Sequence, residues 1–253
     1  MGDALDFKGK TALVTGAASG IGAATARWLG EHSIERLVLV DRDEAGLASL
    51  ELSCAVTAFV GDVADPALWQ RIEAEAGPLD HAVLNAGIAA GAPIADTPFD
   101  EWRRVLSVNL DGAFLSLRSA LRLMRDGGSA VLTASVAGLK AEPNTGAYAV
   151  SKAAVIQLAK VAAREAAARK VRVNAIAPGA VDTPIWDGLA FFEDLVNQGG
   201  NRASALEAMA QIATPLRRYA RAEEIAGQIG FLLSDMAENI TGTVLVSDGG
   251  FAL

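Results

Sequence analysis

The sequence predicts an α/β protein in which seven parallel strands form a doubly wound sheet with helices on both faces. Three observations support this fold class. Short apolar runs alternate with helical patterns along the 253 residues, which is typical of a parallel sheet built from β-α-β units. The apolar runs are continuous, so both faces of the sheet should be buried. A glycine-rich turn links the first run to the first helical pattern.

The predicted strands and helices follow one another along the chain. The strands are runs rich in leucine and β-branched residues: Thr11–Thr15, Arg36–Val40, Val56–Val60, Ala82–Leu84, Ala130–Thr133, Val171–Ile176 and Val244–Val246. The helices are Ile21–Glu31, Glu44–Glu51, Pro66–Ala76, Asp100–Met124, Gly146–Lys170 and Ala222–Leu233. The two longest helices carry apolar residues on more than one face, which favours burial against the sheet and against another subunit.

The chain is predicted to form a single domain, because 51% of its residues are hydrophobic and α/β proteins of this length commonly fold as one unit. Residues 183–215 interrupt the alternation of strands and helices. They open with Thr-Pro-Ile-Trp and contain Asn-Gln-Gly-Gly-Asn at 197–201. A long insertion with hinge-like glycines after a strand end is a candidate substrate lid.

Composition argues against several functions. The 30 acidic and 22 basic residues give a net charge of -8, which disfavours binding to the phosphate backbone of nucleic acids. No apolar stretch reaches the roughly 18 residues that span a bilayer, and the polar N-terminus is unlike a signal peptide. The single cysteine, Cys54, cannot form an internal disulfide and fits a reducing cytoplasm. His32 and His81 have no ligand-spaced neighbours, so we expect no metal site.

The glycine-rich turn is the first candidate ligand site. Gly16, Ser19, Gly20, Ile21 and Gly22 form the pattern G-x-x-x-G-x-G between a strand and a helix. Glycines let a diphosphate approach the backbone, and the N–H groups of the helix N-terminus face the phosphates. The pattern alone is a weak signal, because ordinary glycine-rich turns are frequent.

Asp41 adds a cofactor preference to this site. It ends the second strand about 20 residues beyond the glycines, where a carboxylate can accept hydrogen bonds from an adenosine ribose and repel a 2'-phosphate. Ser19 places no cation in the turn. These residues predict NAD rather than NADP. Arg42 is the opposing observation, because its guanidinium could contact a phosphate, but Asp41 occupies the expected position.

The segment Tyr148-Ala-Val-Ser-Lys152 carries the strongest chemical signal. Residues four apart share one face of a helix, so the phenol and the ammonium can point into one cleft. An adjacent ammonium favours the phenolate and can lower a phenol pKa of ~10 by roughly one to three units. Tyr148 could then exchange a proton near neutral pH. Taken alone, such a pair is more often a solvated helix face.

Together these motifs resemble the short-chain dehydrogenase/reductase family, in its type of roughly 250 residues. The resemblance runs from end to end and is carried by Thr15–Gly22, Asp62–Val63, Asn85–Gly87, Ser107–Asn109, Ser135, Tyr148 with Lys152, Pro178–Gly179, Thr241–Gly242 and Asp248–Gly250. It implies a Rossmann fold and a homotetramer. Leu84 departs from the family pattern, which has an asparagine there that braces the sheet, so local bracing is in question. Ser247 is a milder departure.

The resemblance also implies roles for individual residues. Tyr148 would exchange the proton of a secondary alcohol, Ser135 would hydrogen-bond the same oxygen, and Lys152 would bind the nicotinamide ribose. Asn109 would hold a water beside the lysine. The implied cofactor contacts add to the glycine-rich turn, Asp41 and Arg42. They are Asp62 and Val63 beside the adenine, Asn85, Ala86 and Gly87 along the adenosine ribose, and Ile176, Pro178, Gly179, Val181 and Thr183 around the nicotinamide, with Tyr148 and Lys152 contacting the cofactor as well.

The predicted function is therefore an NAD(H)-dependent oxidoreductase that interconverts a secondary alcohol and a ketone. Two alternatives stay open: an NADP-dependent biosynthetic ketone reductase and a non-catalytic NAD-sensing regulator. The substrate is also open. The apolar residues of the predicted lid, Trp186, Leu189, Phe191 and Phe192, could form a wall over the substrate or pack the lid down, whereas Lys140 and Glu142 could contact polar substrate groups.

Overall fold

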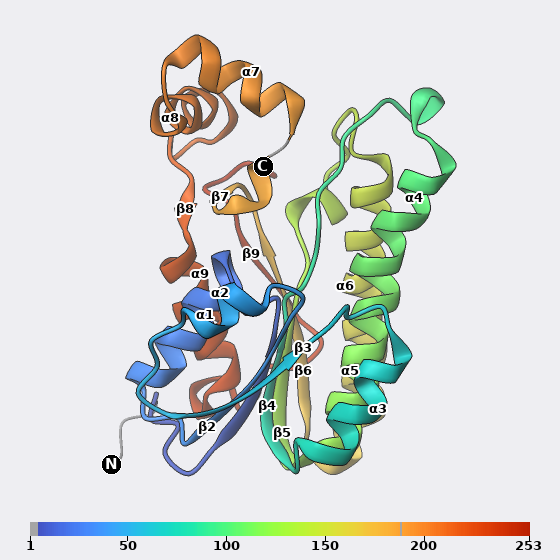
Figure 1. The fold of residues 1–253 in the computed structure, drawn as a ribbon, viewed down its shortest axis with the longest axis vertical. Coiled ribbons are helices and arrows are strands. Elements are labelled where there is room, and N and C mark those ends of the chain that lie inside the picture. The colour runs from blue at the N-terminus through green and yellow to red at the C-terminus, as the bar shows by residue number, and fades with distance from the viewer. Residues whose placement is uncertain (1–4, 188) are drawn as a thin grey trace.

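Seven parallel strands form the central sheet in the order β3-β2-β1-β4-β5-β6-β9 (Figure 1). The computed structural model describes residues 5–187 and 189–253. The strands of this sheet are β1 (Thr11–Thr15), β2 (Arg36–Asp41), β3 (Ala55–Val60), β4 (Leu79–Leu84), β5 (Met124–Thr133), β6 (Arg172–Pro178) and β9 (Val244–Ser247). The predicted fold class is confirmed. The strand order reverses between β1 and β4, and doubly wound sheets bind ligands at such a reversal.

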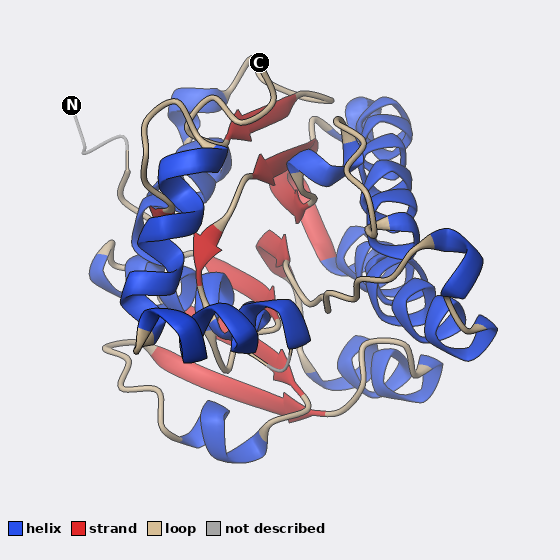
Figure 2. Ribbon diagram, turned by 90° about the horizontal axis from the view of Figure 1, so that it is seen from above, coloured by secondary structure: helices blue, strands red, loops and turns tan. Residues whose placement is uncertain are grey.

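Helices cover both faces of this sheet. They are α1 (Gly20–Glu31), α2 (Glu44–Ala48), α3 (Pro66–Glu75), α4 (Phe99–Leu106), α5 (Gly112–Leu123), α6 (Gly146–Ala166), α7 (Ala190–Gly199), α8 (Arg202–Ala213) and α9 (Ala222–Leu233). The helices α1 and α9 pack together on one face (Figure 1, Figure 2). On the other face α5 and α6 lie against the sheet, with α3 and α4 beside them.

Adjacent residues of each strand enter opposite cores, which explains the continuous apolar runs. Leu13 of β1 lies in the core with residues of α5 and α6, whereas Val14 lies in the core with residues of α1 and α9. Both side chains are fully buried. Because side chains alternate along a strand, only a strand covered on both sides needs apolar residues at every position.

The predicted helix Asp100–Met124 is divided in the structure. After α4 the chain forms a π-helical turn at Ser107–Asp111, which contains Asn109, and α5 then ends at Leu123. Met124 is the first residue of β5. The sequence pattern did not show the π-helical turn because one wider turn barely changes the helical periodicity. Such turns are rare and frequently lie at functional sites.

Other element ends also differ from the prediction. The predicted helix Gly146–Lys170 ends at Ala166 and continues as a 3-10 turn to Arg169, after which Lys170 adopts a left-handed conformation (φ 54°). The predicted helix Glu44–Glu51 ends at Ala48. The strands β4 and β5 begin earlier than predicted, and β6 ends later. These boundaries depend on tertiary hydrogen bonds that a local pattern does not encode.

Residues 183–215 contain α7 and α8, which pack against each other beyond the carboxyl edge of the sheet (Figure 1). Phe192, Ala205 and Leu206 are the buried centre of a small core in this segment. The chain enters through β7 (Val181–Asp182), which pairs with β8 (Ala220–Arg221) after the segment ends. Strands of two residues are too short to produce a periodic pattern, so the sequence did not predict this pair.

The described part of the chain contains no helix that is long and apolar enough to cross a membrane. Within residues 5–187 and 189–253, no three His, Cys, Asp or Glu side chains are grouped to hold a metal ion. Cys54 is a free, partly buried thiol.

His81 on β4 predicts a pH dependence of stability. The side chain is 8% exposed, its Nδ1 lies 2.8 Å from Ser129 Oγ, and burial lowers its pKa from 6.5 to about 4. Since the unfolded chain binds this proton more tightly, the stabilisation is complete above pH 6.5 and is lost as the pH falls toward 4. We expect a loss on the order of 3 kcal/mol in the free energy of unfolding, measured by urea titration at several pH values. His81→Gln should flatten this slope, and an unchanged slope would contradict the assignment.

Candidate active site

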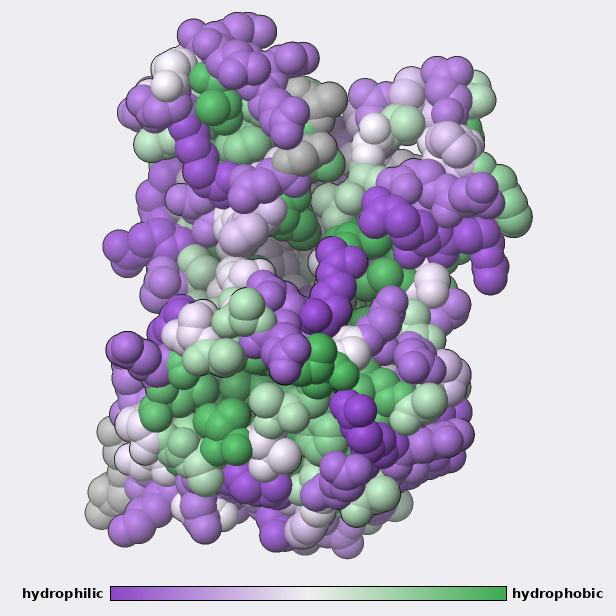
Figure 3. All heavy atoms as spheres, viewed as in Figure 1, coloured by the Kyte–Doolittle hydropathy of each residue, from purple (hydrophilic) through white to green (hydrophobic). Residues whose placement is uncertain are grey.

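The predicted site residues that follow strands lie along one edge of the sheet, because all seven strands are parallel and end on the same side. The glycine-rich turn follows β1, Asp41 ends β2, and the segments carrying Asp62, Asn85, Ser135 and Gly179 follow β3, β4, β5 and β6. A view from above this edge shows the strand ends ringed by helices (Figure 2). The molecule is hollowed on this side, between the segment with α7 and α8 and the side formed by α4 (Figure 3).

The glycine-rich turn closes tightly on itself and on the loop after β4. A Cβ atom on Gly22 would lie 1.9 Å from the carbonyl oxygen of Gly16, and one on Gly16 would lie 2.8 Å from Ala86 Cα. Gly16 also has a φ of 64°, which favours glycine. Ser19 is the exposed N-cap residue of α1, and its side chain makes no capping hydrogen bond. The turn therefore presents backbone and an uncapped helix N-terminus to the crevice.

Thr15 braces the loop after β4, a role that the sequence did not reveal. Its hydroxyl accepts hydrogen bonds from the backbone N–H groups of Asn85 (2.9 Å) and Ala86 (3.1 Å). The Asn85 side chain donates to the Gly16 carbonyl at 3.3 Å. Leu84 is 4% exposed and packs in the core, so the bracing expected from an asparagine there is supplied by Thr15. A polar residue at the end of an otherwise apolar strand was the available signal.

Asp41 points at the glycine-rich turn. One carboxylate oxygen accepts a hydrogen bond from Ala18 N at 2.9 Å, and the other accepts one from Asp43 N at 3.0 Å. Each carboxylate oxygen keeps a lone pair for a further donor. Arg42 is exposed, and no hydrogen bond or ion pair involves its guanidinium among the described residues.

Ser135 is brought to α6 by a close approach of two backbones. Its hydroxyl accepts a hydrogen bond from Ala137 N at 3.2 Å and begins a 3-10 turn, Val136–Gly138. A Cβ on Gly138 would lie 2.7 Å from the Lys152 carbonyl carbon, so only glycine allows this packing. The turn after β5 thus rests on the helix at the level of Tyr148 and Lys152.

Tyr148 differs in one respect from the prediction. Burial raises the pKa of its phenol, and a hydrogen bond with Ser135 partly offsets this effect. We expected Lys152 to lower that pKa, and this direction was wrong for the structure described. The reason is burial, which disfavours the charged phenolate, whereas the Lys152 ammonium, 5.7 Å from the centre of the Tyr148 ring, donates to the Thr133 carbonyl at 2.9 Å. The hydrogen bond with Ser135 places the predicted acid and its predicted partner together.

Lys152 and Asn109 meet at Gly87. A Cβ on Gly87 would lie 3.2 Å from Lys152 Nζ and 3.3 Å from Asn109 Oδ1. Lys152 is 4% exposed, and burial lowers its pKa to about 8. The Asn109 amide exchanges two hydrogen bonds with the backbone of Ile88, at 2.8 and 2.9 Å, so its orientation is fixed. The π-helical turn therefore places Asn109 and Lys152 against the same glycine.

Thr183 lies against the opposite side of the glycine-rich turn. A Cβ on Gly20 would lie 3.2 Å from Thr183 Cβ, and Thr183 is 8% exposed. Gly179 approaches the backbone of Asp248 so closely that a Cβ would lie 2.8 Å from its Cα. The remaining predicted nicotinamide contacts are buried beside them: Ile176, Pro178 and Val181.

The predicted adenine contacts lie after β3. Asp62 is exposed and accepts a hydrogen bond from Ala64 N at 2.8 Å, which closes a turn. Val63 is 6% exposed, and a Cβ on Gly112 would lie 2.7 Å from its Cγ2. Gly112 is therefore needed for α5 to approach this loop.

Trp186, Leu189, Phe191 and Phe192, the four residues predicted to form an apolar wall in segment 183–215, divide into two groups. Phe192 is buried in the small core, and Trp186 and Leu189 pack against it, so these three hold the segment together. Phe191 is 49% exposed. Ile185, which the sequence analysis did not single out, is 39% exposed.

Lys140 and Glu142 are engaged within the chain. Lys140 Nζ donates to the Phe251 carbonyl at 2.8 Å and lies 3.5 Å from Glu142. A hollow of about 470 Å³ lies beside Lys140, between the end of α8 and the C-terminal residues. None of the four predicted catalytic residues lines it.

Two observations support a dinucleotide site in the crevice at the carboxyl edge of the sheet. The turn contributes no side chain at Gly16 and Gly22, where a Cβ would collide with backbone at 2.8 and 1.9 Å, so a diphosphate could approach its N–H groups closely. The Thr133 hydroxyl, at the end of β5, is buried without a hydrogen-bond partner in the described part of the chain. A buried polar atom normally has a partner, so an orphan at this edge is consistent with a ligand that supplies one.

Comparison with known proteins agrees with this geometry. A family model described as Enoyl-(Acyl carrier protein) reductase matches residues 16–252. The chain is 38% identical to a cis-4-hydroxycyclohexanecarboxylate dehydrogenase of Sinomonas cyclohexanicum, with 99% of both chains covered. It is 33% identical to an NADP-dependent (R)-specific alcohol dehydrogenase of Lentilactobacillus kefiri, over 97% of both. A short-chain type dehydrogenase/reductase of Mycobacterium marinum superposes with a TM-score of 0.86 at 31% identity, with 98% of both chains covered.

Proposed function

Because this chain belongs to the short-chain dehydrogenase/reductase family, we propose that it is an NAD(H)-dependent enzyme that interconverts a secondary alcohol and a ketone. Its relatives are dehydrogenases and reductases that act on CH–OH groups; one is named as NADP-dependent, and a solved L-sorbose reductase of Gluconobacter frateurii is complexed with NADPH. The observation that carries the proposal is the meeting of Ser135, Tyr148 and Lys152 beside the glycine-rich turn.

In the proposed chemistry, Tyr148 donates the proton that the substrate oxygen receives. Its raised pKa keeps the phenol protonated near neutral pH, and this form can donate to the oxygen of a carbonyl substrate. Ser135 binds the same oxygen and orients it. The nicotinamide, when bound, supplies or accepts the hydride. The reverse reaction requires Tyr148 to take the hydroxyl proton of the alcohol.

Lys152 and Asn109 support the phenol in this proposal. A cation bound close to Tyr148 stabilises the phenolate left after proton donation. The buried Lys152 has a pKa of about 8, so it is mostly charged at neutral pH. Asn109, whose amide is held by the Ile88 backbone, would hold a water beside the lysine. The cofactor would be held by Gly16–Gly22, Asp41, Val63, Asn85 and the residues around Thr183.

The cofactor preference is proposed from Asp41. Since Ala18 N and Asp43 N hold its carboxylate at the turn, a 2'-phosphate there would meet a fixed negative charge. Asp41→Ser should lower the ratio of kcat/KM with NAD to kcat/KM with NADP by about tenfold or more. This is the effect expected when one negative charge close to the 2'-phosphate is removed. Asp43→Ser, which removes a neighbouring carboxylate but keeps the backbone N–H that binds Asp41, is the control. An equal ratio in wild type and Asp41→Ser would contradict the ribose assignment.

The first substrates to test are cyclic secondary alcohols. Three of its relatives are named for six-membered ring compounds, including two 2,5-dichloro-2,5-cyclohexadiene-1,4-diol dehydrogenases of Sphingobium indicum that are 36% and 35% identical. The exposed side chains of Ile185 and Phe191 would offer a ring apolar contact. The test is to mix the enzyme with NAD or NADP and a panel of such alcohols, and to follow reduced cofactor. Tight binding of NAD without turnover of any alcohol or ketone would instead support the sensor.

We further propose a single domain whose segment 183–215 acts as the substrate lid, and a cytoplasmic homotetramer. The small core of α7 and α8 supports a lid that moves as a unit.

The homotetramer is supported by exposed apolar residues on α4, α5 and α6, which could form a subunit contact: Phe99, Phe114, Val150 and Val161. Light scattering tests the assembly, and a value for a monomer would contradict it.

A further inference from the structure

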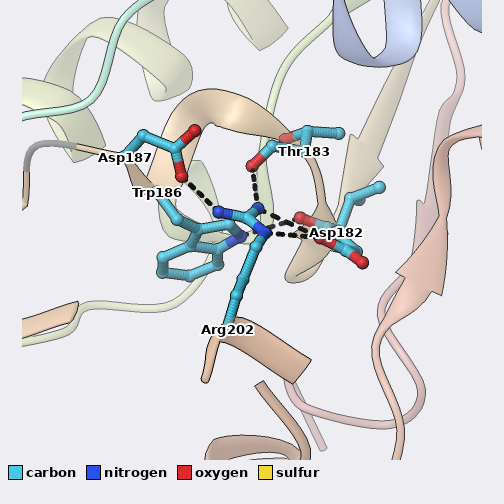
Figure 4. Close-up of polar contacts among 6 residues, drawn as sticks. Asp182, Thr183, Trp186, Asp187 and Arg202 are labelled. Carbon is cyan, nitrogen blue, oxygen red and sulfur yellow. Dashed lines mark hydrogen bonds and ion pairs between the residues drawn. The ribbon is translucent and has the colours of Figure 1, made fainter. Parts of the chain in front are cut away.

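Arg202, the first residue of α8, ties the predicted lid to the loop that leaves the sheet. Its guanidinium donates to Asp182 Oδ1 at 3.0 Å, to the Thr183 carbonyl at 2.7 Å, and to Asp187. Figure 4 shows the guanidinium between the two aspartates, with the Trp186 indole alongside. It also lies 5.3 Å from the centre of the Phe192 ring in the small core. One side chain therefore joins both ends of the turn Pro184–Trp186 to α7 and α8.

The loop that Arg202 holds is the one that touches the glycine-rich turn. Thr183, whose carbonyl it binds, lies where a Cβ on Gly20 would be 3.2 Å away. The Trp186 indole N–H donates to the Val181 carbonyl at 2.7 Å, which closes the loop on itself. Arg202 thus connects α8 to Thr183 and, through Thr183, to the glycine-rich turn.

The positive charge of Arg202 also affects the electrostatic potential near Thr183. Asp182 and Asp187 flank Thr183, and the guanidinium offsets one of their two negative charges. A dinucleotide brings two phosphate charges to the same region, so removing the arginine would leave two carboxylates to repel them. These ion pairs are partly exposed and would contribute little alone, but a guanidinium that binds two carboxylates and a carbonyl is a geometrically restrictive contact.

We propose that Arg202 is a positioning residue that couples closure of segment 183–215 to binding of the nicotinamide cofactor. This inference rests on the proposed function, because it requires a dinucleotide in the crevice. Arg202 touches neither the predicted catalytic side chains nor the glycine-rich turn, so it acts through Thr183. Cofactor binding and lid closure should then weaken together when the guanidinium is removed.

The test compares three variants by two readouts. Arg202→Ala removes the contact, and Arg202→Lys keeps the charge without the planar fork. Arg169→Ala is the matched control, because Arg169 binds Asp126 and the carbonyls of Leu121 and Met124 far from the crevice. The readouts are the Kd of NADH, or of NADPH if wild type binds it more tightly, and hydrogen exchange of the α7 and α8 amides with and without cofactor.

We expect Arg202→Ala to raise the cofactor Kd by about five- to tenfold and to abolish the protection of α7 and α8 by cofactor. Arg202→Lys should recover part of the affinity, and Arg169→Ala should retain wild-type affinity and protection. A wild-type Kd of the cofactor in Arg202→Ala would overturn this inference and leave the proposed function standing. Equal weakening in Arg169→Ala would also overturn it, since general destabilisation would then explain the loss. Failure of wild type to bind either cofactor would overturn the proposed function as well.

Discussion

Tyr148→Phe should lower the turnover of secondary alcohols and ketones by about 10³-fold, because it removes the group proposed to exchange the substrate proton. The ring and its packing remain, and the dinucleotide contacts come from other residues, so the Kd of NADH should stay within about twofold of wild type. Steady-state kinetics and a fluorescence titration with NADH measure the two quantities. A large loss of turnover with preserved affinity is the signature of a group that acts in the chemical step.

The chain contains a matched control for this substitution, because it has two tyrosines. Tyr219 stacks on Trp186, with ring centres 6.0 Å apart, and supports the small core beside α7 and α8. Tyr219→Phe also deletes one phenol hydroxyl but should keep most of the turnover. If Tyr148→Phe retained wild-type turnover, or if both variants lost it equally, Tyr148 would not be the general acid.

Gly22→Ala should have the second large effect, on the affinity for the cofactor. The added methyl would lie 1.9 Å from the Gly16 carbonyl oxygen, and that oxygen belongs to backbone that cannot rotate away. The turn must therefore open, which displaces the N-terminus of α1 and the Asn85 side chain that binds Gly16. We expect the Kd of NADH to rise by at least about 100-fold and the free energy of unfolding to fall by roughly 1–3 kcal/mol.

Gly30→Ala is the control for Gly22→Ala in the same helix. A Cβ on Gly30 would find its nearest neighbour, Ser53 Oγ, at 3.5 Å, an ordinary contact. Alanine favours a helix over glycine, so this variant should be stabilised by about 0.5–1 kcal/mol with unchanged cofactor affinity. Thermal or urea unfolding and NADH titration of the two variants give the comparison. Wild-type NADH affinity in Gly22→Ala would contradict the proposed diphosphate-binding role of the turn.

Much of the site was predictable because position along a parallel sheet follows from chain order. Each strand end in the sequence became a strand end at one edge, so Asp41 and Ser135 meet the same crevice although 93 residues lie between them in the chain. The helical spacing of Tyr148 and Lys152 was equally local information. Thr15 was the exception, since its bond to Asn85 depends on how β1 and β4 pair.

The sequence by itself determined the fold class, the strand-end positions of the motifs and the family. Apolar periodicity and chain order can be read directly from the sequence, and in a parallel sheet the strand ends all lie at one edge. Only the tertiary structure decided the environment of each group. Burial set the pKa of Tyr148 in the direction opposite to that expected from Lys152, because loss of water around the phenol disfavours its charged form. Arg202 likewise gained its partners only when α8 folded back on the loop before it, because such contacts depend on three-dimensional distance rather than on residue pattern.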